Sequence, residues 1–267
     1  MDQAYLPKDA SILIVGAGTF GLSTAVHLAR RGYTNIQCVD RFPYPSPDSA
    51  GFDINKIVSL RNDTPMYSRM TREALAGWQD EPILAPVWHE VGMVTTATSE
   101  ETTDYCRRAY QGWIEGGEGK NVRWLENKED FAALVPQVGG LSESNGSGWR
   151  GFYHQRAGWA DADRALRIFG DEAKKNGVRF SHGPSATMHS LLLNDKGEAK
   201  GIVAQDGTEL LADCIVLCTG AWTDSLIDTE SQLEARCWTL AHLQLTPDEC
   251  AQFKGIPVVL NLEEGTY

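Results

Sequence analysis

A glycine-rich turn between a short apolar strand and a helix is the feature that most limits how this chain can fold. Residues 11–15 read Ser-Ile-Leu-Ile-Val and run directly into Gly-Ala-Gly-Thr-Phe-Gly over 16–21. The first glycine permits a tight turn, the second lets the backbone approach a pyrophosphate, and the third lets a helix pack closely on the strand. A second strand over 36–40 ends in Asp40, which is placed to accept ribose hydrogen bonds and to repel a 2′-phosphate. Strand, turn, helix and acid follow in the order of a dinucleotide-binding βαβ unit.

The composition limits the partners and the compartment of the chain. Of 267 residues, 24 are Lys or Arg and 36 are Asp or Glu, which gives a formal net charge of −12. Nucleic acids and anionic membranes need a cationic face, so this balance argues against both as partners. No apolar stretch is long enough to cross a bilayer, and the first residues lack the pattern of a signal peptide. We therefore expect an intracellular protein, whose oligomeric state the sequence does not indicate.

Cysteine and histidine spacing indicates no metal or disulfide chemistry. The six cysteines contain no C-x-x-C pair, and the six histidines form no H-x-x-x-H array. The expectation is a reduced protein without a metal site.

The later elements extend the fold beyond a simple nicotinamide-binding domain. A loop rich in proline and small residues occupies 41–51, where such a domain would usually turn quickly into another helix. A β-meander is expected over 187–211, and the apolar run 214–218 is typical of a buried parallel strand. That run leads into a second glycine turn over 219–222, and a further strand is expected over 236–245.

A helix is predicted to begin at Pro65. The preceding Thr64 is a favourable cap, and proline suits the first helical position. Met and Trp at helical spacing are more often core than cofactor contacts. The expected core-facing stripe consists of Tyr67, Met70, Ala74 and Trp78.

Together these segments resemble the FAD-dependent oxidoreductases of the D-amino acid oxidase and sarcosine oxidase group, and within it the fructosyl amino acid oxidases (amadoriases). The resemblance implies an α/β fold, α+β overall. Its parts are a Rossmann-like FAD-binding domain of the glutathione reductase type with a β-meander, and an interleaved, incomplete mixed-sheet substrate domain. The expected FAD-binding parts are 1–60 and 156–232, and the expected substrate parts are 61–155 and 233–267. The matching runs are 16–21, 49–57, 158–160, 219–222 and 241–247.

The resemblance also assigns roles to individual residues. Lys56 inherits a catalytic place beside the flavin ring, where a fixed cation stabilises the negative charge that develops as oxygen is reduced. Arg61 matches an arginine that pairs with the substrate carboxylate, a task that suits a forked guanidinium. Spacing alone favours the alternative that both are ordinary solvated charges on a loop. The implied cofactor-binding residues are Gly16, Gly18, Thr19, Phe20, Gly21, Asp40, Arg41, Ser49, Ala50, Gly51, Asn55, Lys56, Val178, Gly220 and Trp222.

The resemblance implies FAD-dependent oxidation of the C–N bond of a secondary amine in an N-substituted amino acid. An imine and hydrogen peroxide would be formed, with a small-molecule amine and oxygen as partners. The alternatives are an inactive FAD-binding remnant, a nicotinamide-dependent reductase, or an oxidase of sarcosine, pipecolate or saccharopine-like amines. The cytoplasm is the expected compartment, or the peroxisome if a missing C-terminus carries a targeting signal.

The chain is expected to be truncated. It stops at Tyr267, before the point where the family has its flavin-linking cysteine, a substrate-contacting acid and a second substrate-binding lysine. Covalent flavin is therefore not supported for this chain, and we expect weak FAD retention and association through exposed apolar surface.

Overall fold

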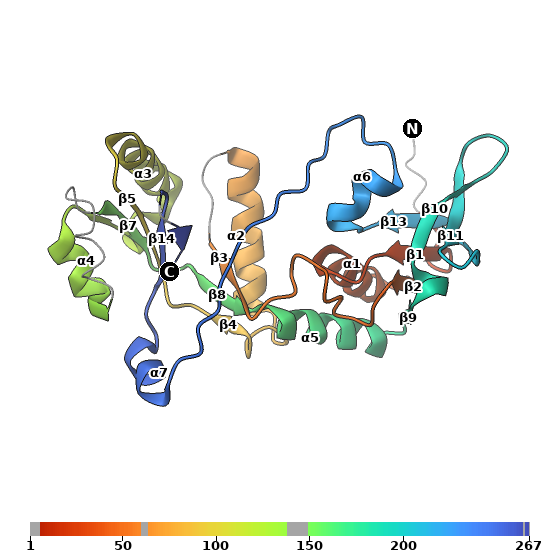
Figure 1. The fold of residues 1–267 in the computed structure, drawn as a ribbon, viewed down its shortest axis with the longest axis horizontal. Coiled ribbons are helices and arrows are strands. Elements are labelled where there is room, and N and C mark those ends of the chain that lie inside the picture. Colours follow the sequence, from red (N-terminus) through yellow and green to blue (C-terminus); the bar gives the residue numbers. More distant parts are fainter. Residues whose placement is uncertain (1–5, 60–63, 138–148, 264, 267) are drawn as a thin grey trace. The chain divides into compact units, whose positions relative to one another are not determined.

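The chain folds into two compact units, each built from two stretches of sequence. The structure is a computed structural model that describes residues 6–59, 64–137, 149–263 and 265–266 (Figure 1). The first unit comprises Met1–Ile54 and Asp161–Thr239, and the second comprises Asn55–Ala160 and Leu240–Tyr267. The assignment of the expected segments to FAD and substrate domains stays a prediction.

A parallel four-stranded sheet forms the centre of the first unit (Figure 1). The sheet order is β13-β1-β2-β9, so β1 lies between β13 and β2. Along β1, Ile14 is opposite Val216 on one side and Cys38 on the other. The predicted strands at 11–15, 36–40 and 214–218 are confirmed. The bounds are β1 (Ser11–Val15), β2 (Asn35–Asp40), β9 (Arg179–His182) and β13 (Cys214–Leu217).

Both faces of this sheet are covered, which explains why β1 is apolar at every interior position. Ile12 and Ile14 pack in one cluster with α1 (Thr19–Arg30) and α5 (Ala162–Lys175). Leu13 packs in a second cluster with the β-meander on the opposite face. Each such side chain contributes about 1.5–3 kcal/mol when fully buried. The meander is the antiparallel sheet of β10 (Met188–Leu193), β11 (Ala199–Ala204) and β12 (Glu209–Leu211).

The second unit contains a mixed five-stranded sheet with helices on both faces. Its order is β15-β14-β5-β7-β6, and a smaller sheet has the order β3-β8-β4. One core cluster includes Cys106 and Trp113 of α3, and the other includes Phe131 of α4. The strands are β3 (Asn55–Val58), β4 (Trp88–His89), β5 (Met93–Ala97), β6 (Val122–Leu125), β7 (Arg150–His154), β8 (Gly158–Asp161), β14 (Val258–Asn261) and β15 (Gly265–Thr266).

Side-chain caps fix where most helices of the second unit begin. Thr64 accepts a hydrogen bond from Tyr67 N, which confirms the predicted start of α2. Thr246 and Glu249 form a capping box at the start of α7. These helices are α2 (Pro65–Asp80), α3 (Glu100–Trp113), α4 (Lys128–Leu134) and α7 (Pro247–Phe253), and the first unit adds the short α6 (Thr223–Leu226).

The predicted core stripe of α2 is wrong for Tyr67, Met70 and Ala74, whereas Trp78 is half-buried with its ring 6.3 Å from that of Trp88. Tyr67 is 47% exposed and Met70 is 51% exposed, whereas Ser68 and Leu75 are buried. The period was right but the rotation about the helix axis was not, because a one-residue offset turns the stripe by about 100°.

The predicted strand over 236–245 is also wrong, since the segment has no regular secondary structure. Trp238 is 87% exposed and Leu243 is 85% exposed. A strand needs a neighbouring strand for its backbone groups, and none of the described sheets includes this segment.

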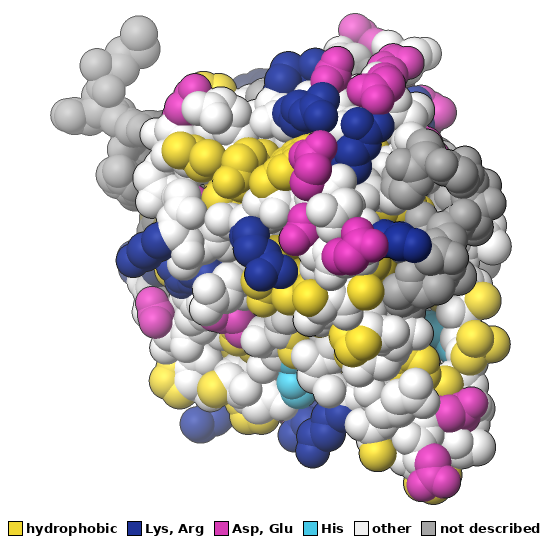
Figure 2. All heavy atoms as spheres, turned by 90° about the vertical axis from the view of Figure 1, so that its left-hand side faces the viewer, with side chains coloured by type: hydrophobic (Ala, Val, Ile, Leu, Met, Phe, Trp, Pro, Cys, Tyr) yellow, Lys and Arg dark blue, Asp and Glu magenta, His cyan; other side chains and the backbone are white. Residues whose placement is uncertain are grey.

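The surface shows no gathering of one charge on the face drawn in Figure 2. Lys and Arg side chains are interspersed there with Asp and Glu side chains among the described residues. Of the described helices, none is long and apolar enough to cross a membrane. No group of three or more His, Cys, Asp and Glu in the described part of the chain is arranged to hold a metal ion.

Glu263 ties the segment after β14 to the beginning of α3. Its carboxylate accepts hydrogen bonds from the backbone N–H of Thr98 and of Ser99, both at 3.0 Å, and from the hydroxyls of Ser99 and Thr102. Partial burial alone would raise the pKa of Glu263, but these hydrogen bonds outweigh it and lower the pKa to about 2. The carboxylate supplies the negative charge that a helix N-terminus favours.

We expect Glu263→Gln to destabilise the fold by about 1 kcal/mol at pH 7, because an exposed cap of this kind contributes about that much. The folded-state pKa is depressed, so this contribution is full above the ordinary glutamate pKa and is lost as the pH falls toward about 2. Urea unfolding at pH 7 and pH 4 tests this. The difference between wild type and variant should shrink at pH 4, and an equal difference at both values contradicts the ionic contribution.

Candidate dinucleotide-binding site

Two of the three fingerprint glycines are required by the fold itself. Gly16 has a φ of +110°, and a Cβ there would lie 2.3 Å from the carbonyl oxygen of Cys218. A Cβ on Gly21 would lie 1.7 Å from the carbonyl oxygen of Gly16. These glycines therefore allow the turn and the close packing of α1 on β1, as the sequence predicted.

Gly18 is different, because its own backbone does not demand glycine. Its φ is −90°, and an added Cβ would meet only the Ser49 side chain, at 3.0 Å from Cβ. The Ser49 Oγ is buried and has no hydrogen-bond partner among the described residues. A buried hydroxyl without a partner costs about 1–3 kcal/mol. Glycine at position 18 leaves a space open beside the unsatisfied Ser49 hydroxyl. This space fits a polar ligand that passes between Gly18 and Ser49.

The N-terminus of α1 is available to an anion. Gly18 is the cap residue, so no side chain caps this 12-residue helix, and its first turn contains no acid. By contrast, α2, α3, α4 and α7 each have a side-chain cap. The N–H groups and the dipole of α1 therefore favour a phosphate group at the glycine turn.

Asp40 holds the glycine turn and the loop after β2 together. Its carboxylate accepts from the N–H of Ala17 at 2.7 Å, from the N–H of Phe42 at 3.0 Å and from the hydroxyl of Ser46 at 3.0 Å. A carboxylate offers about four acceptor positions, so capacity remains for a ribose hydroxyl. This structural duty of Asp40 was not foreseen from the sequence.

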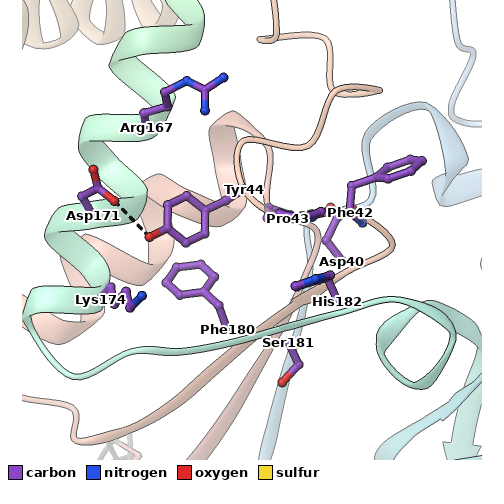
Figure 3. A pocket seen from close by; sticks show the side chains of 11 residues that line it. Asp40, Phe42, Pro43, Tyr44, Arg167, Asp171, Lys174, Phe180, Ser181 and His182 are labelled. Carbon is purple, nitrogen blue, oxygen red and sulfur yellow. Dashed lines mark hydrogen bonds between the residues drawn. The ribbon is translucent and has the colours of Figure 1, made fainter.

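A pocket adjoins Asp40 at the carboxyl ends of β2 and β9 (Figure 3). Its volume is about 440 Å³, and the rings of Tyr44 and Phe180 lie 4.5 Å apart on its wall. Tyr44 donates to Asp171 at 3.0 Å, and burial followed by this hydrogen bond raises the pKa of Tyr44. The lining residues are Ala17, Asp40, Phe42, Pro43, Tyr44, Arg167, Asp171, Lys174, Phe180, Ser181 and His182.

Sequence reasoning missed this pocket, although one signal for it existed. Ligands of open α/β sheets bind outside the carboxyl ends of the strands, and β9 ends at His182 beside the pocket. The pocket shares Ala17 and Asp40 with the glycine turn. Its aromatic walls suit a planar ring system.

The loop expected to contact the cofactor does reach the glycine turn. A Cβ on Gly51 would lie 2.2 Å from the hydroxyl of Thr19. Ala50 and Phe20 are exposed, whereas Val178 is buried in the core of the first unit, where its side chain is packed against other apolar groups.

The remaining predicted residues divide between the units. Gly220 has a φ of +52° and begins the short helix η5 (Gly220–Trp222), and Arg41 stacks on Trp222 within the first unit. Asn55 and Lys56 belong to β3 of the second unit, where Asn55 is exposed and Lys56 is half-buried. Arg61 lies outside the described residues.

Comparison with known proteins shows which protein family the sequence of this chain matches. The family described as "FAD dependent oxidoreductase" matches residues 11–267. L-saccharopine oxidase of Schizosaccharomyces pombe is 29% identical over 268 residues, which cover 94% of this chain and 60% of that protein.

Solved structures of similar sequence have the same fold. Fructosyl peptide oxidase from E. terrenum superposes with a TM-score of 0.90 at 35% identity, over 98% of this chain and 61% of that one. Fructosamine oxidase (Amadoriase II) from Aspergillus fumigatus gives 0.85 at 37% identity, over 98% and 59%. This chain thus spans about 60% of the length of the relatives it matches.

Substitution of the glycines separates folding from binding. We expect Gly18→Val to fold, because only the Ser49 side chain has to give way, yet to lose nucleotide binding by filling the space beside the α1 N-terminus. Gly21→Val should fail to fold stably, since its side chain would overlap the Gly16 carbonyl. Thermal unfolding and titration with ADP measure the two effects. Undiminished ADP binding by Gly18→Val contradicts the site.

Proposed function

Because this chain belongs to the family of FAD dependent oxidoreductases, we propose that its first unit binds the ADP part of FAD at the glycine turn. The observation that carries the proposal is the uncapped N-terminus of α1 beside Gly18 and the unsatisfied Ser49 hydroxyl. The pyrophosphate would take hydrogen bonds from this N-terminus, and Asp40 would accept from the ribose. The pocket that Asp40 shares with Tyr44 and Phe180 would hold the adenosine.

The proposed reaction is the oxidation of a secondary amine in an N-substituted amino acid. When bound, FAD would supply the two-electron chemistry, so that the C–N bond becomes an imine and oxygen becomes hydrogen peroxide. Water then hydrolyses the imine. The identity of 35–37% to the fructosyl peptide and fructosamine oxidases supports a fructosyl amino acid as substrate.

A saccharopine-like amine is the second candidate substrate. The observation that favours it is the 29% identity to L-saccharopine oxidase over almost the whole chain. Both substrates are secondary amines that bear a carboxylate, which is the group proposed to pair with Arg61. Peroxide release from each amine, compared at equal concentration, distinguishes them.

The proposed compartment is the cytoplasm or the peroxisome.

Binding without turnover is the alternative of a different class. The chain spans about 60% of the length of its relatives. Substrate oxidation is an activity of those longer proteins, and we propose it for this chain by extension. A protein that binds FAD and releases no peroxide from either amine would support the alternative.

Titration of the purified 267-residue chain with FAD tests the cofactor assignment. We expect saturable binding that ADP competes away, because the glycine turn recognises the ADP part. NADH has the same ADP part and should compete too, but it should bind more weakly than FAD, because the long loop after β2 indicates a flavin nucleotide. Flavin fluorescence and calorimetry provide the measurement, with Gly18→Val as the control. Preferential binding of NADH would instead favour a nicotinamide-dependent reductase.

Replacement of Lys56 tests the proposed oxygen chemistry. In a preparation that turns over, we expect Lys56→Met to slow reoxidation by oxygen roughly tenfold or more, with a smaller effect on reduction by the amine. A fixed cation matters most where negative charge develops. Stopped-flow measurement separates the half-reactions, and Lys120→Met removes an exposed charge of the same unit as a control. Equal losses in both half-reactions contradict the role.

A further inference from the structure

Three separate contacts hold the side chain of Tyr44 against α5 and β9. Its hydroxyl donates a hydrogen bond to the carboxylate of Asp171 at 3.0 Å (Figure 3). Its ring centroid lies 4.5 Å from that of Phe180. On the side of α5, a Cβ added to Gly170 would lie 2.1 Å from the Tyr44 ring. The ring therefore occupies a notch in the helix surface that exists only because residue 170 is glycine.

The glycine in this notch has no other structural reason. Gly170 lies inside α5, where glycine is less favourable than alanine. Its φ is outside the left-handed region, so the backbone does not require glycine there. The three atoms nearest to an added Cβ all belong to the ring of Tyr44. The helix thus gives up some of its own stability to accept this ring.

The loop that contains Tyr44 is stiff. Prolines stand at positions 43, 45 and 47. Because proline fixes its own φ and restricts the residue before it, every backbone position from 42 to 47 is constrained. Turn hydrogen bonds continue the constraint, since Ser49 N donates to Ser46 O at 3.0 Å and Phe52 N donates to Ser49 O at 2.9 Å. A shift at Tyr44 would therefore be passed on to Ser49.

The same loop lines the glycine turn. The N–H of Ser46 donates to the carbonyl of Ala17 at 3.4 Å, and its hydroxyl donates to Asp40 at 3.0 Å. Ser49 faces Gly18 across the space proposed for the pyrophosphate. Tyr44 packs against the core cluster that includes Ala17, on the face of the sheet that α1 and α5 cover. The loop is thus fixed to α5 near its beginning and borders the α1 N-terminus further on.

We propose that Tyr44 is a positioning residue that holds the loop in the conformation that receives the nucleotide, with Gly170 and Asp171 acting through it. We call these three residues the Tyr44 latch. The inference rests on the proposed binding of FAD at the glycine turn. The latch orders Ser49 before the ligand arrives, so it raises the fraction of free protein that is able to bind. Its loss slows association and leaves dissociation unchanged.

The first experiment removes the hydrogen bond of the latch and keeps the ring. Stopped-flow flavin fluorescence follows the association of FAD, and displacement of bound FAD by excess ADP gives its dissociation, so no turnover is needed. We expect Tyr44→Phe and Asp171→Ala each to slow association about fivefold, the scale of one hydrogen bond, with dissociation at the wild-type rate. The double variant should be no slower than either single variant, because both remove the same bond.

The second experiment fills the notch. Gly170→Ala should slow association roughly tenfold or more, because the new methyl group overlaps the Tyr44 ring, although alanine favours the helix itself. In a Tyr44→Ala background, where the ring is absent, the same substitution should cause no further loss. This dependence on Tyr44 distinguishes the latch from a general effect on α5.

Matched controls test each kind of change away from the latch. Tyr33→Phe removes a tyrosine hydroxyl, and Asp195→Ala removes an exposed carboxylate, both within the first unit. Gly77→Ala adds a methyl group inside α2, where nothing lies within 4 Å of it. All three should bind and release FAD at wild-type rates, and circular dichroism confirms that each variant is folded.

The outcomes separate the latch from the cofactor assignment. A wild-type chain that binds neither FAD nor ADP overturns the proposed function and the latch with it. Wild-type association rates in folded Tyr44→Phe and Asp171→Ala overturn the latch alone. Faster dissociation with unchanged association in Tyr44→Phe also overturns it, because the hydroxyl would then contact the ligand directly.

Discussion

The first unit depends on the direct contact between the backbone of α1 and the backbone at the end of β1. A Cβ on Gly21 would lie 1.7 Å from the Gly16 carbonyl, so the helix sits as close to the strand as two backbones allow. This closeness brings the helix N-terminus to the carboxyl end of the sheet without an intervening side chain. The anion-binding property of the turn and the burial of Leu22 and Val26 against the sheet are two results of one contact.

Asp40 links this contact to the rest of the proposed site. Its three hydrogen bonds connect the glycine turn to the loop after β2, so the acid shapes the site before it meets any ligand. The same loop supplies Tyr44 to the pocket and Ser49 to the edge of the turn. Replacement of Asp40 would therefore alter the loop as well as the ribose contact, whereas a side chain at Gly18 would displace only the Ser49 side chain besides filling the ligand space.

Patterns of neighbouring residues in the sequence were sufficient to predict strands and helix starts, because short-range interactions determine these elements. The strands at 11–15, 36–40 and 214–218 and the cap at Thr64 are confirmed. Contacts between distant segments were out of reach of such patterns. The rotation of α2, the absence of 236–245 from the described sheets and the cap that Glu263 provides to α3 each depend on residues far away in sequence. The pocket beside Asp40 was missed for the same reason, because Phe180 joins Tyr44 only in the folded chain.

The exposed segment over 230–244 has a consequence for how the chain is handled. Every residue from 230 to 244 is exposed, and none of them belongs to a helix or strand. Proteases cleave exposed, irregular backbone most readily, so we expect cleavage in this stretch before cleavage in any strand of the first unit's sheet. The cut would not release the piece that follows it, because β14 pairs with β5 over four residues from Val258 to Asn261. A nicked sample would therefore migrate as one species in solution and as two bands once denatured.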